Sequence, residues 1–119
     1  MIKFYGYSKW SSVRKAKVWL EENNLEFENI EIVKNPPTKE ELMEMYKVSG
    51  YDIKKFFNTS GVKYRELGLK DVVKTESDDK LLEILASDGM LIKRPIAFDG
   101  QNVLIGFKED EWKEKLLNK

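Results

Sequence analysis

The first part of the chain changes its hydrophobic period twice. Bulky residues alternate with polar ones over residues 2–7 and again over 27–33, as they do in strands. Between these segments apolar residues recur at helical spacing, at Val13, Ala16 and Leu20. This helix is expected to begin at Ser11 or Ser12, whose hydroxyl can cap it, and to run to about Asn23. The pattern predicts a βαβ unit.

The middle of the chain has the pattern of a helical block. Thr38 and Glu41 have the spacing of a capping box, which predicts a helix that ends near Ser49-Gly50. Its expected inward residues are Leu42, Met45 and Tyr46. Shorter helices are expected at 52–57 and at 62–67, the second closed by Gly68. Ser77 is expected to cap a further helix whose apolar side carries Leu81, Leu82 and Leu85.

The last part returns to strand patterns. Residues 90–98 are expected to be extended, Asp99-Gly100 is a strong hairpin signal, and residues 103–106 form the expected partner strand. A terminal helix is predicted from Lys108 to Leu117, with apolar contacts from Trp112, Leu116 and Leu117. The order is therefore βαβ, a helical block, then ββα. We predict one α/β domain over 1–119, with a helical insertion at about 38–87 and a mixed sheet of about four strands.

Composition then narrows the chemistry. The 119 residues include no cysteine and no histidine, which excludes thiol redox chemistry, disulfides, Cys/His zinc sites and a Ser-His-Asp triad. We expect no metal and no cofactor. Twenty-one basic residues balance 21 acidic ones, so direct nucleic-acid binding is not expected. The sequence shows no apolar run of the ~20 residues that span a bilayer and no signal-peptide pattern, so we expect a cytoplasmic protein without membrane contact.

The order of elements, with Arg94-Pro95 before the third strand, resembles the thioredoxin fold of the arsenate reductase and Spx-like family. The resemblance extends over essentially the whole chain. It is carried in order by residues 9–22, Phe57-Asn58-Thr59-Ser60-Gly61, Tyr64-Arg65-Glu66-Leu67-Gly68-Leu69, Lys93-Arg94-Pro95-Ile96 and Gly106-Phe107-Lys108-Glu109-Asp110-Glu111. It implies that Pro95 is a cis-proline facing the start of the first helix. A trans proline that begins an edge strand is the alternative.

The resemblance also implies a site from which the reactive groups are missing. Trp10 and Val13 occupy the positions of the family's Cys-x-x-Cys cysteines. Of the three arginines that hold an oxyanion in the arsenate-reducing branch, only Arg94 matches, and Asn58 and Gly106 fall at the other two positions. Catalytic arsenate reduction is therefore not expected.

The remaining candidate site residues each have two interpretations. Val13 is interpreted as core. Trp10 is either a lid over Pro95 or an aromatic anchor for a partner. Ser11 and Ser12 are expected to cap the helix, since a serine without a neighbouring base is a poor nucleophile. Together with Arg94, the free amides at the helix start could bind an anion weakly; in the alternative, Arg94 pairs with an internal carboxylate.

The favoured function is a non-catalytic family member that acts by binding. Spx-type regulators bind the C-terminal domain of the RNA polymerase α subunit, and Gly50 falls near a glycine that they use at this contact. This implies a regulator with polymerase as its protein partner. The alternative is an arsenate reductase-like enzyme that relies on an external thiol such as glutathione. A paralogue without distinct activity is the third interpretation.

Overall fold

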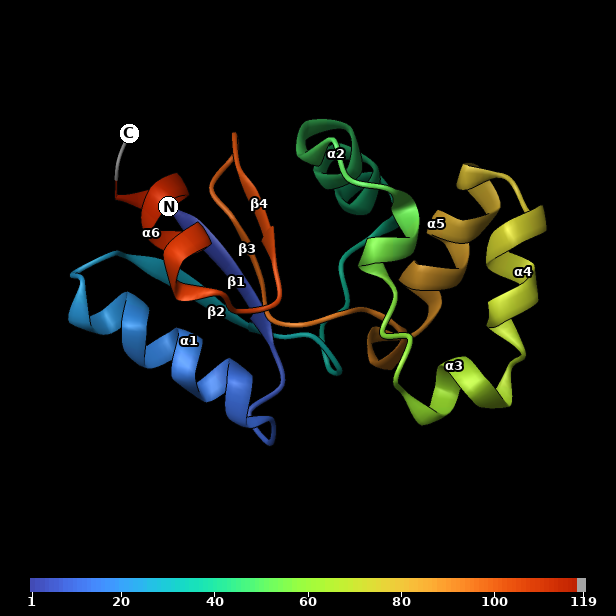
Figure 1. Cartoon of the computed structure of the whole chain (residues 1–119), viewed down its shortest axis with the longest axis horizontal. Helices are drawn as coiled ribbons and strands as arrows, with labels where there is room; N and C mark the ends of the chain where they lie inside the picture. The colour runs from blue at the N-terminus through green and yellow to red at the C-terminus, as the bar shows by residue number, and fades with distance from the viewer. Residues whose placement is uncertain (118–119) are drawn as a thin grey trace. The chain divides into compact units, whose positions relative to one another are not determined.

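The computed structural model describes residues 1–117, which fall into two compact units (Figure 1). The first unit comprises Met1–Glu31 and the segment from Arg94 onward. The second unit is Ile32–Lys93 and contains the predicted helical insertion at about 38–87. That residues 1–119 form a single domain stays a prediction.

The first unit is built on a four-stranded mixed sheet. Its strands are β1 (Ile2–Gly6), β2 (Phe27–Glu31), β3 (Ile96–Phe98) and β4 (Val103–Ile105), in the order β2-β1-β3-β4. β1 runs parallel to β2 and antiparallel to β3, and β4 is antiparallel to β3. The predicted α/β class, mixed sheet and terminal hairpin are therefore confirmed.

Helices α1 (Ser11–Glu22) and α6 (Glu109–Leu116) share one hydrophobic core with this sheet. The core contains Ile2, Phe4, Val13, Ala16, Trp19, Leu20, Ala97, Leu104, Trp112 and Leu116. The Trp19 and Trp112 rings meet edge to face, with 6.1 Å between their centroids. Trp19 was missing from the predicted inward face of α1. Leu117 was expected to be a core contact, but it lies after the end of α6 and is 38% exposed.

The second unit contains α2 (Lys39–Ser49), α3 (Val62–Glu66), α4 (Leu69–Thr75), α5 (Asp78–Ser87) and the short 3₁₀ helices Ile53–Phe56 and Gly89–Leu91. The predicted capping box is present. The Glu41 amide donates to Thr38 Oγ1 at 3.1 Å, and the Thr38 amide donates to Glu41 Oε1 at 2.9 Å. Ser77 caps α5 by accepting from the Lys80 amide at 3.2 Å.

Two predictions for the second unit were wrong. Gly68 has a left-handed backbone, with φ of 63°, and ends α3 as expected, but it is followed at once by α4, which the sequence pattern did not indicate. α4 buries only Leu69 fully, so its apolar period is too short to recognise. Residues 90–98 are not extended throughout, because Asp88 caps the 3₁₀ turn Gly89–Leu91 through the Met90 amide. β3 begins only at Ile96.

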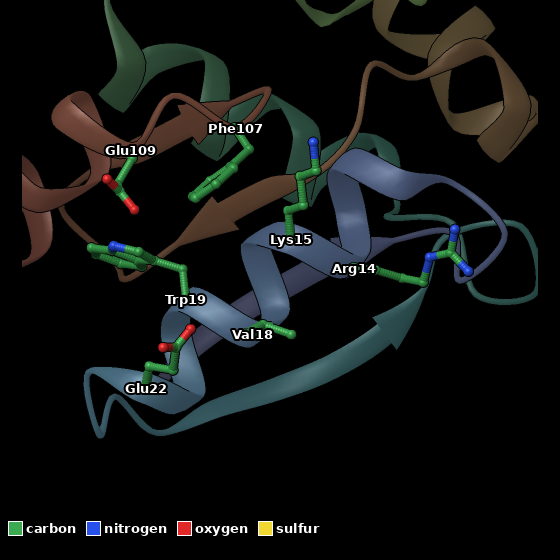
Figure 2. Close-up of a pocket in the computed structure, with 7 residues that line it drawn as sticks. All are labelled: Arg14, Lys15, Val18, Trp19, Glu22, Phe107 and Glu109. Carbon is green, nitrogen blue, oxygen red and sulfur yellow. The ribbon is translucent and has the colours of Figure 1, made fainter.

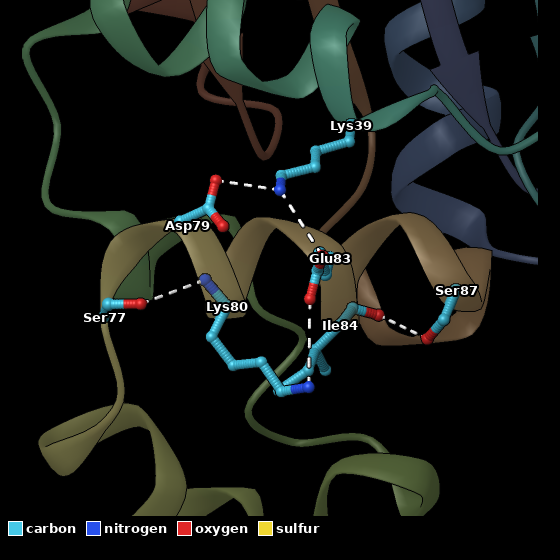
Figure 3. A network of polar contacts seen from close by, with 7 residues as sticks. All are labelled: Lys39, Ser77, Asp79, Lys80, Glu83, Ile84 and Ser87. Atoms are coloured by element: carbon cyan, nitrogen blue, oxygen red, sulfur yellow. Dashed lines mark hydrogen bonds and ion pairs between the residues drawn. The ribbon is translucent and has the colours of Figure 1, made fainter.

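Polar side chains join α2 to α5 within the second unit. Lys39 Nζ lies 2.8 Å from Asp79 Oδ1 and 3.5 Å from Glu83 Oε1 (Figure 3). The Tyr46 hydroxyl donates to Asp78 Oδ2 at 2.8 Å, which explains why Tyr46 is half-buried and not fully inward. The hydrogen bond to Asp79 is the main cause that raises the pKa of Lys39, and the one to Asp78 raises the pKa of Tyr46.

Within residues 1–117, none of the helices has both the length and the apolar character that crossing a membrane requires.

Candidate functional site

The candidate site lies in the first unit, where the chain turns from β1 into α1. The Trp10 amide donates to the Tyr7 carbonyl at 3.0 Å, and the Ser8 amide donates to Glu31 Oε1 at the end of β2 at 3.2 Å. These two bonds fix the turn against the sheet. Gly6 ends β1 close to the helix, since a Cβ at this position would lie 2.5 Å from Val13 Cγ1.

The expectation that Ser11 or Ser12 caps α1 was wrong. Trp10 is the N-cap residue, with an extended backbone (φ −94°, ψ 131°), and its carbonyl accepts from the Arg14 amide at 3.2 Å. Ser11 is therefore the first residue of the helix. A capping oxygen must come from the extended residue before the helix, and the Trp10 side chain has none. The amides of the first turn of α1 have no side-chain cap.

Val13 has the role expected of it. It is 4% exposed and belongs to the core that α1 shares with the sheet. Val13 is thus a packed aliphatic core residue, and its correspondence to a family cysteine stays a prediction.

Arg94 and Trp10 lie together at the start of α1. The guanidinium carbon of Arg94 is 4.2 Å from the centroid of the Trp10 ring and 5.7 Å from that of Tyr7. Arg94 is 2% exposed, whereas Trp10 is half-buried. A cation against an aromatic face is attracted by the ring quadrupole, and the attraction is stronger when both groups are desolvated. The Trp10 ring thus lies against the buried guanidinium of Arg94 at the start of α1.

Sequence reasoning missed the contact between Trp10 and Arg94. Trp10 was weighed as a lid over Pro95 or as a partner anchor, and Tyr7 was not considered. No local signal could have found this contact, since Arg94 is distant in the sequence from Tyr7 and Trp10. Anion binding by Ser11, Ser12 and Arg94 stays a prediction.

The Arg94-Pro95 peptide bond is cis, as the resemblance implied. The Pro95 carbonyl accepts from the Gly106 amide at 2.8 Å, and the Gly106 carbonyl accepts from Trp112 Nε1 at 2.9 Å. Gly106 has a φ of 75°, in the left-handed region that glycine adopts without strain. An arginine at this position would be unfavourable, which gives a local reason for glycine here.

The other two candidate residues, Asn58 and Gly50, belong to the second unit. Asn58 is 3% exposed, its amide donates to the Leu91 carbonyl at 2.8 Å, and its carbonyl accepts from the Gly61 amide at 3.0 Å. Gly50 is exposed and ends α2 with a φ of 69°. Both residues thus have structural roles, and a contact of Gly50 with polymerase stays a prediction.

The chemistry open to this arrangement is limited. The chain has no cysteine to supply a thiolate, and at the start of α1 the Trp10 ring lies against the buried guanidinium of Arg94. Within residues 1–117 there is no group of three or more acidic side chains placed to hold a metal ion. The fold and the site together define a thioredoxin-like protein without a reactive thiol.

Comparisons with known proteins identify its family. The model of the ArsC family matches residues 5–115, and the chain belongs to this family. It is 57% identical over 113 residues to the uncharacterized protein YusI of Bacillus subtilis, covering 95% of this chain and 96% of that protein. It is 30% identical to the global transcriptional regulator Spx of Streptococcus agalactiae, covering 93% and 80%.

A solved structure supports the same family. The crystal structure of a putative ArsC family related protein from Bacteroides fragilis is 44% identical to this chain and superposes with a TM-score of 0.91, covering 95% of each chain. The resemblance to the arsenate reductase and Spx-like family is therefore confirmed, including its members' thioredoxin-like fold.

Proposed function

We propose that this protein acts without redox chemistry, as a cytoplasmic regulator that binds the C-terminal domain of the RNA polymerase α subunit. The observation that carries the proposal is Trp10 in the place of the nucleophile, with its ring against Arg94. An enzyme at this site would need a thiolate and an accessible arginine, whereas a binding protein needs neither.

The relatives support the regulatory side of the proposal. One of them is named a global transcriptional regulator, and it matches 93% of this chain. The resemblance to Spx-type regulators supports polymerase as the proposed partner and Gly50 as a proposed contact residue. Trp10, half-buried beside Arg94, is a rigid aromatic side chain of the kind enriched at interface hot spots.

The test is a binding titration with the purified α C-terminal domain from the same organism. We expect wild-type protein to bind, Trp10→Ala to bind at least about tenfold more weakly and Trp10→Phe to stay close to wild type, because the ring supplies the contact. Circular dichroism of each variant checks that the fold is kept. No binding by the wild-type protein, or equal binding by Trp10→Ala, would contradict the proposal.

A variant at Gly50 tests the second part of the contact. Asparagine tolerates the left-handed backbone, and a Cβ at this position meets nothing within 4 Å, so Gly50→Asn should fold normally. If Gly50 lies in the interface, the added side chain should weaken binding.

The enzymatic alternative is tested in parallel. Turnover of arsenate with glutathione by the purified protein, lost in Arg94→Lys, would overturn the non-catalytic proposal.

A further inference from the structure

The outward face of α1 carries charges that the described fold does not use. Arg14, Lys15, Glu21 and Glu22 are all exposed, and Val18 between them is 50% exposed. Within residues 1–117, none of the four charged side chains takes part in an ion pair or a side-chain hydrogen bond. Their arrangement therefore has no explanation in the packing of the first unit.

The order of these charges also opposes the helix dipole. Carboxylates stabilise the first turn of a helix and cations the last turn. α6 follows this rule, with Glu109, Asp110 and Glu111 in its first turn and Lys113 and Lys115 in its last. α1 has no acidic residue in its first turn and no basic one in its last. Its basic pair, Arg14 and Lys15, lies toward the N-terminal end of the helix, and its acidic pair, Glu21 and Glu22, lies at the C-terminal end. The stability of α1 itself does not account for this order.

The pattern is symmetric about Val18. Arg14 and Lys15 come four and three residues before it, and Glu21 and Glu22 come three and four residues after it. At a rise of about 1.5 Å per residue, each pair lies about 5–6 Å from Val18 along the helix. If two α1 helices lie antiparallel with a two-fold axis at Val18, the cations of one face the carboxylates of the other. These charges then also complement the dipole of the second helix.

A hollow beside this face supplies apolar surface. It has a volume of about 430 Å³ and is lined by Arg14, Lys15, Val18, Trp19, Glu22, Phe107 and Glu109 (Figure 2). Trp19 and Phe107 form its aromatic part, with 6.3 Å between ring centroids. Figure 2 shows Arg14, Lys15, Val18 and Glu22 extending from α1, and Phe107 and Glu109 lying on the other side of the hollow.

We propose that two copies of this chain associate through α1, antiparallel about a two-fold axis at Val18. Arg14 and Lys15 of one copy contact Glu21 and Glu22 of the second, and the two Val18 side chains meet beside the Trp19–Phe107 hollow. Such a contact is isologous, so each charge pair occurs twice. The formal net charge of zero leaves no overall repulsion between copies.

The expected dimer is weak. One helix of 12 residues presents less surface than a standard interface, so we expect dissociation in the micromolar range or above. Because the charge pairs lie at the surface, added salt should weaken the association. The proposal does not depend on the polymerase partner.

Charge reversal gives a direct test by sedimentation velocity across micromolar to near-millimolar concentrations. Arg14→Glu/Lys15→Glu makes all four positions acidic, and Glu21→Lys/Glu22→Lys makes all four basic. Each double variant alone should be monomeric. An equimolar mixture of the two should form a heterodimer, and the chain carrying all four changes should dimerise again.

The control is Lys70→Glu/Lys74→Glu, which changes two exposed residues of α4 and shifts the net charge by the same amount as the acidic variant. It should dimerise like the wild type. A wild-type protein that stays monomeric throughout the range would overturn the proposal, as would a mixture of the two double variants that fails to associate. Loss of the dimer in the α4 control would also overturn it, since net charge would then be the cause.

Discussion

At the scale of single residues, Trp10 and Val13 have different roles at the start of α1. Val13 belongs to the core, while Trp10 is the N-cap of α1 and its ring lies against Arg94. An indole against a buried guanidinium is a favourable cation–π contact. The turn that precedes α1 is thus stabilised by packing.

The packing of Val13 against Gly6 can be measured. A Cβ at Gly6 would lie 2.5 Å from Val13 Cγ1, so Gly6→Ala should lower the free energy of unfolding by about 1–3 kcal/mol through overpacking. Val13→Ala alone should also destabilise, because it leaves a cavity.

The double variant should lose less unfolding free energy than the sum of the losses of the two single variants, since removal of Val13 Cγ1 relieves the clash with the Cβ at position 6. Urea unfolding of the four proteins measures this coupling. Strict additivity would mean that Gly6 and Val13 do not meet.

At the scale of elements, sequence patterns succeeded where the signal is local. The Thr38–Glu41 capping box and the Asp99-Gly100 hairpin were predicted from their own residues. The N-cap of α1 was assigned to a serine and not to Trp10 because serine is a preferred cap and tryptophan is not. α4 was missed because a short helix after a left-handed glycine has little period to read.

The hydrogen bond that joins α2 to α5 predicts how the stability of the protein changes at alkaline pH. The hydrogen bond from Tyr46 to Asp78 is the first cause that raises the pKa of Tyr46 above its ordinary value of about 10. A raised pKa in the folded state contributes stability below pH 10 that is lost as the pH rises further.

Tyr46→Phe should therefore cost about 0.5–1.5 kcal/mol of unfolding free energy at neutral pH, and the difference from wild type should shrink above pH 10. Denaturant titrations from pH 7 to the alkaline limit of folding measure both effects. Tyr64, whose pKa is raised by burial, is present in both proteins and serves as the common background. A difference that stays constant with pH would contradict the assignment to the Tyr46–Asp78 bond.

At the scale of the whole molecule, the absence of cysteine and histidine separates this chain from thiol-based regulation. Diamide and dithiothreitol act on thiols and disulfides, which this chain cannot form. Binding to the polymerase domain and the midpoint of urea unfolding should therefore be the same under both reagents. A shift of either quantity in protein treated with diamide would show a redox response that these residues cannot supply.

The family and the four-stranded sheet could be predicted from the sequence, because their motifs occur in order along the whole chain. The cis bond before Pro95 was available only through the family resemblance. The Trp10–Arg94 contact and the hollow lined by Trp19 and Phe107 could not be predicted from the sequence, because they depend on how distant segments pack. The order of the charged residues in α1 is visible in the sequence, but its interpretation as a contact surface required the structure to show which face of the helix is exposed.

The distribution of tryptophan has an optical consequence. Trp10, Trp19 and Trp112, the three tryptophans of the chain, all lie in the first unit, and Ile32–Lys93 contains none. Fluorescence excited at the red edge of indole absorption therefore reports on the sheet-containing unit alone, while the circular dichroism of helices draws heavily on α2 to α5. Trp10 is the most exposed of the three indoles, so its quenching by iodide provides a label-free view of events beside Arg94.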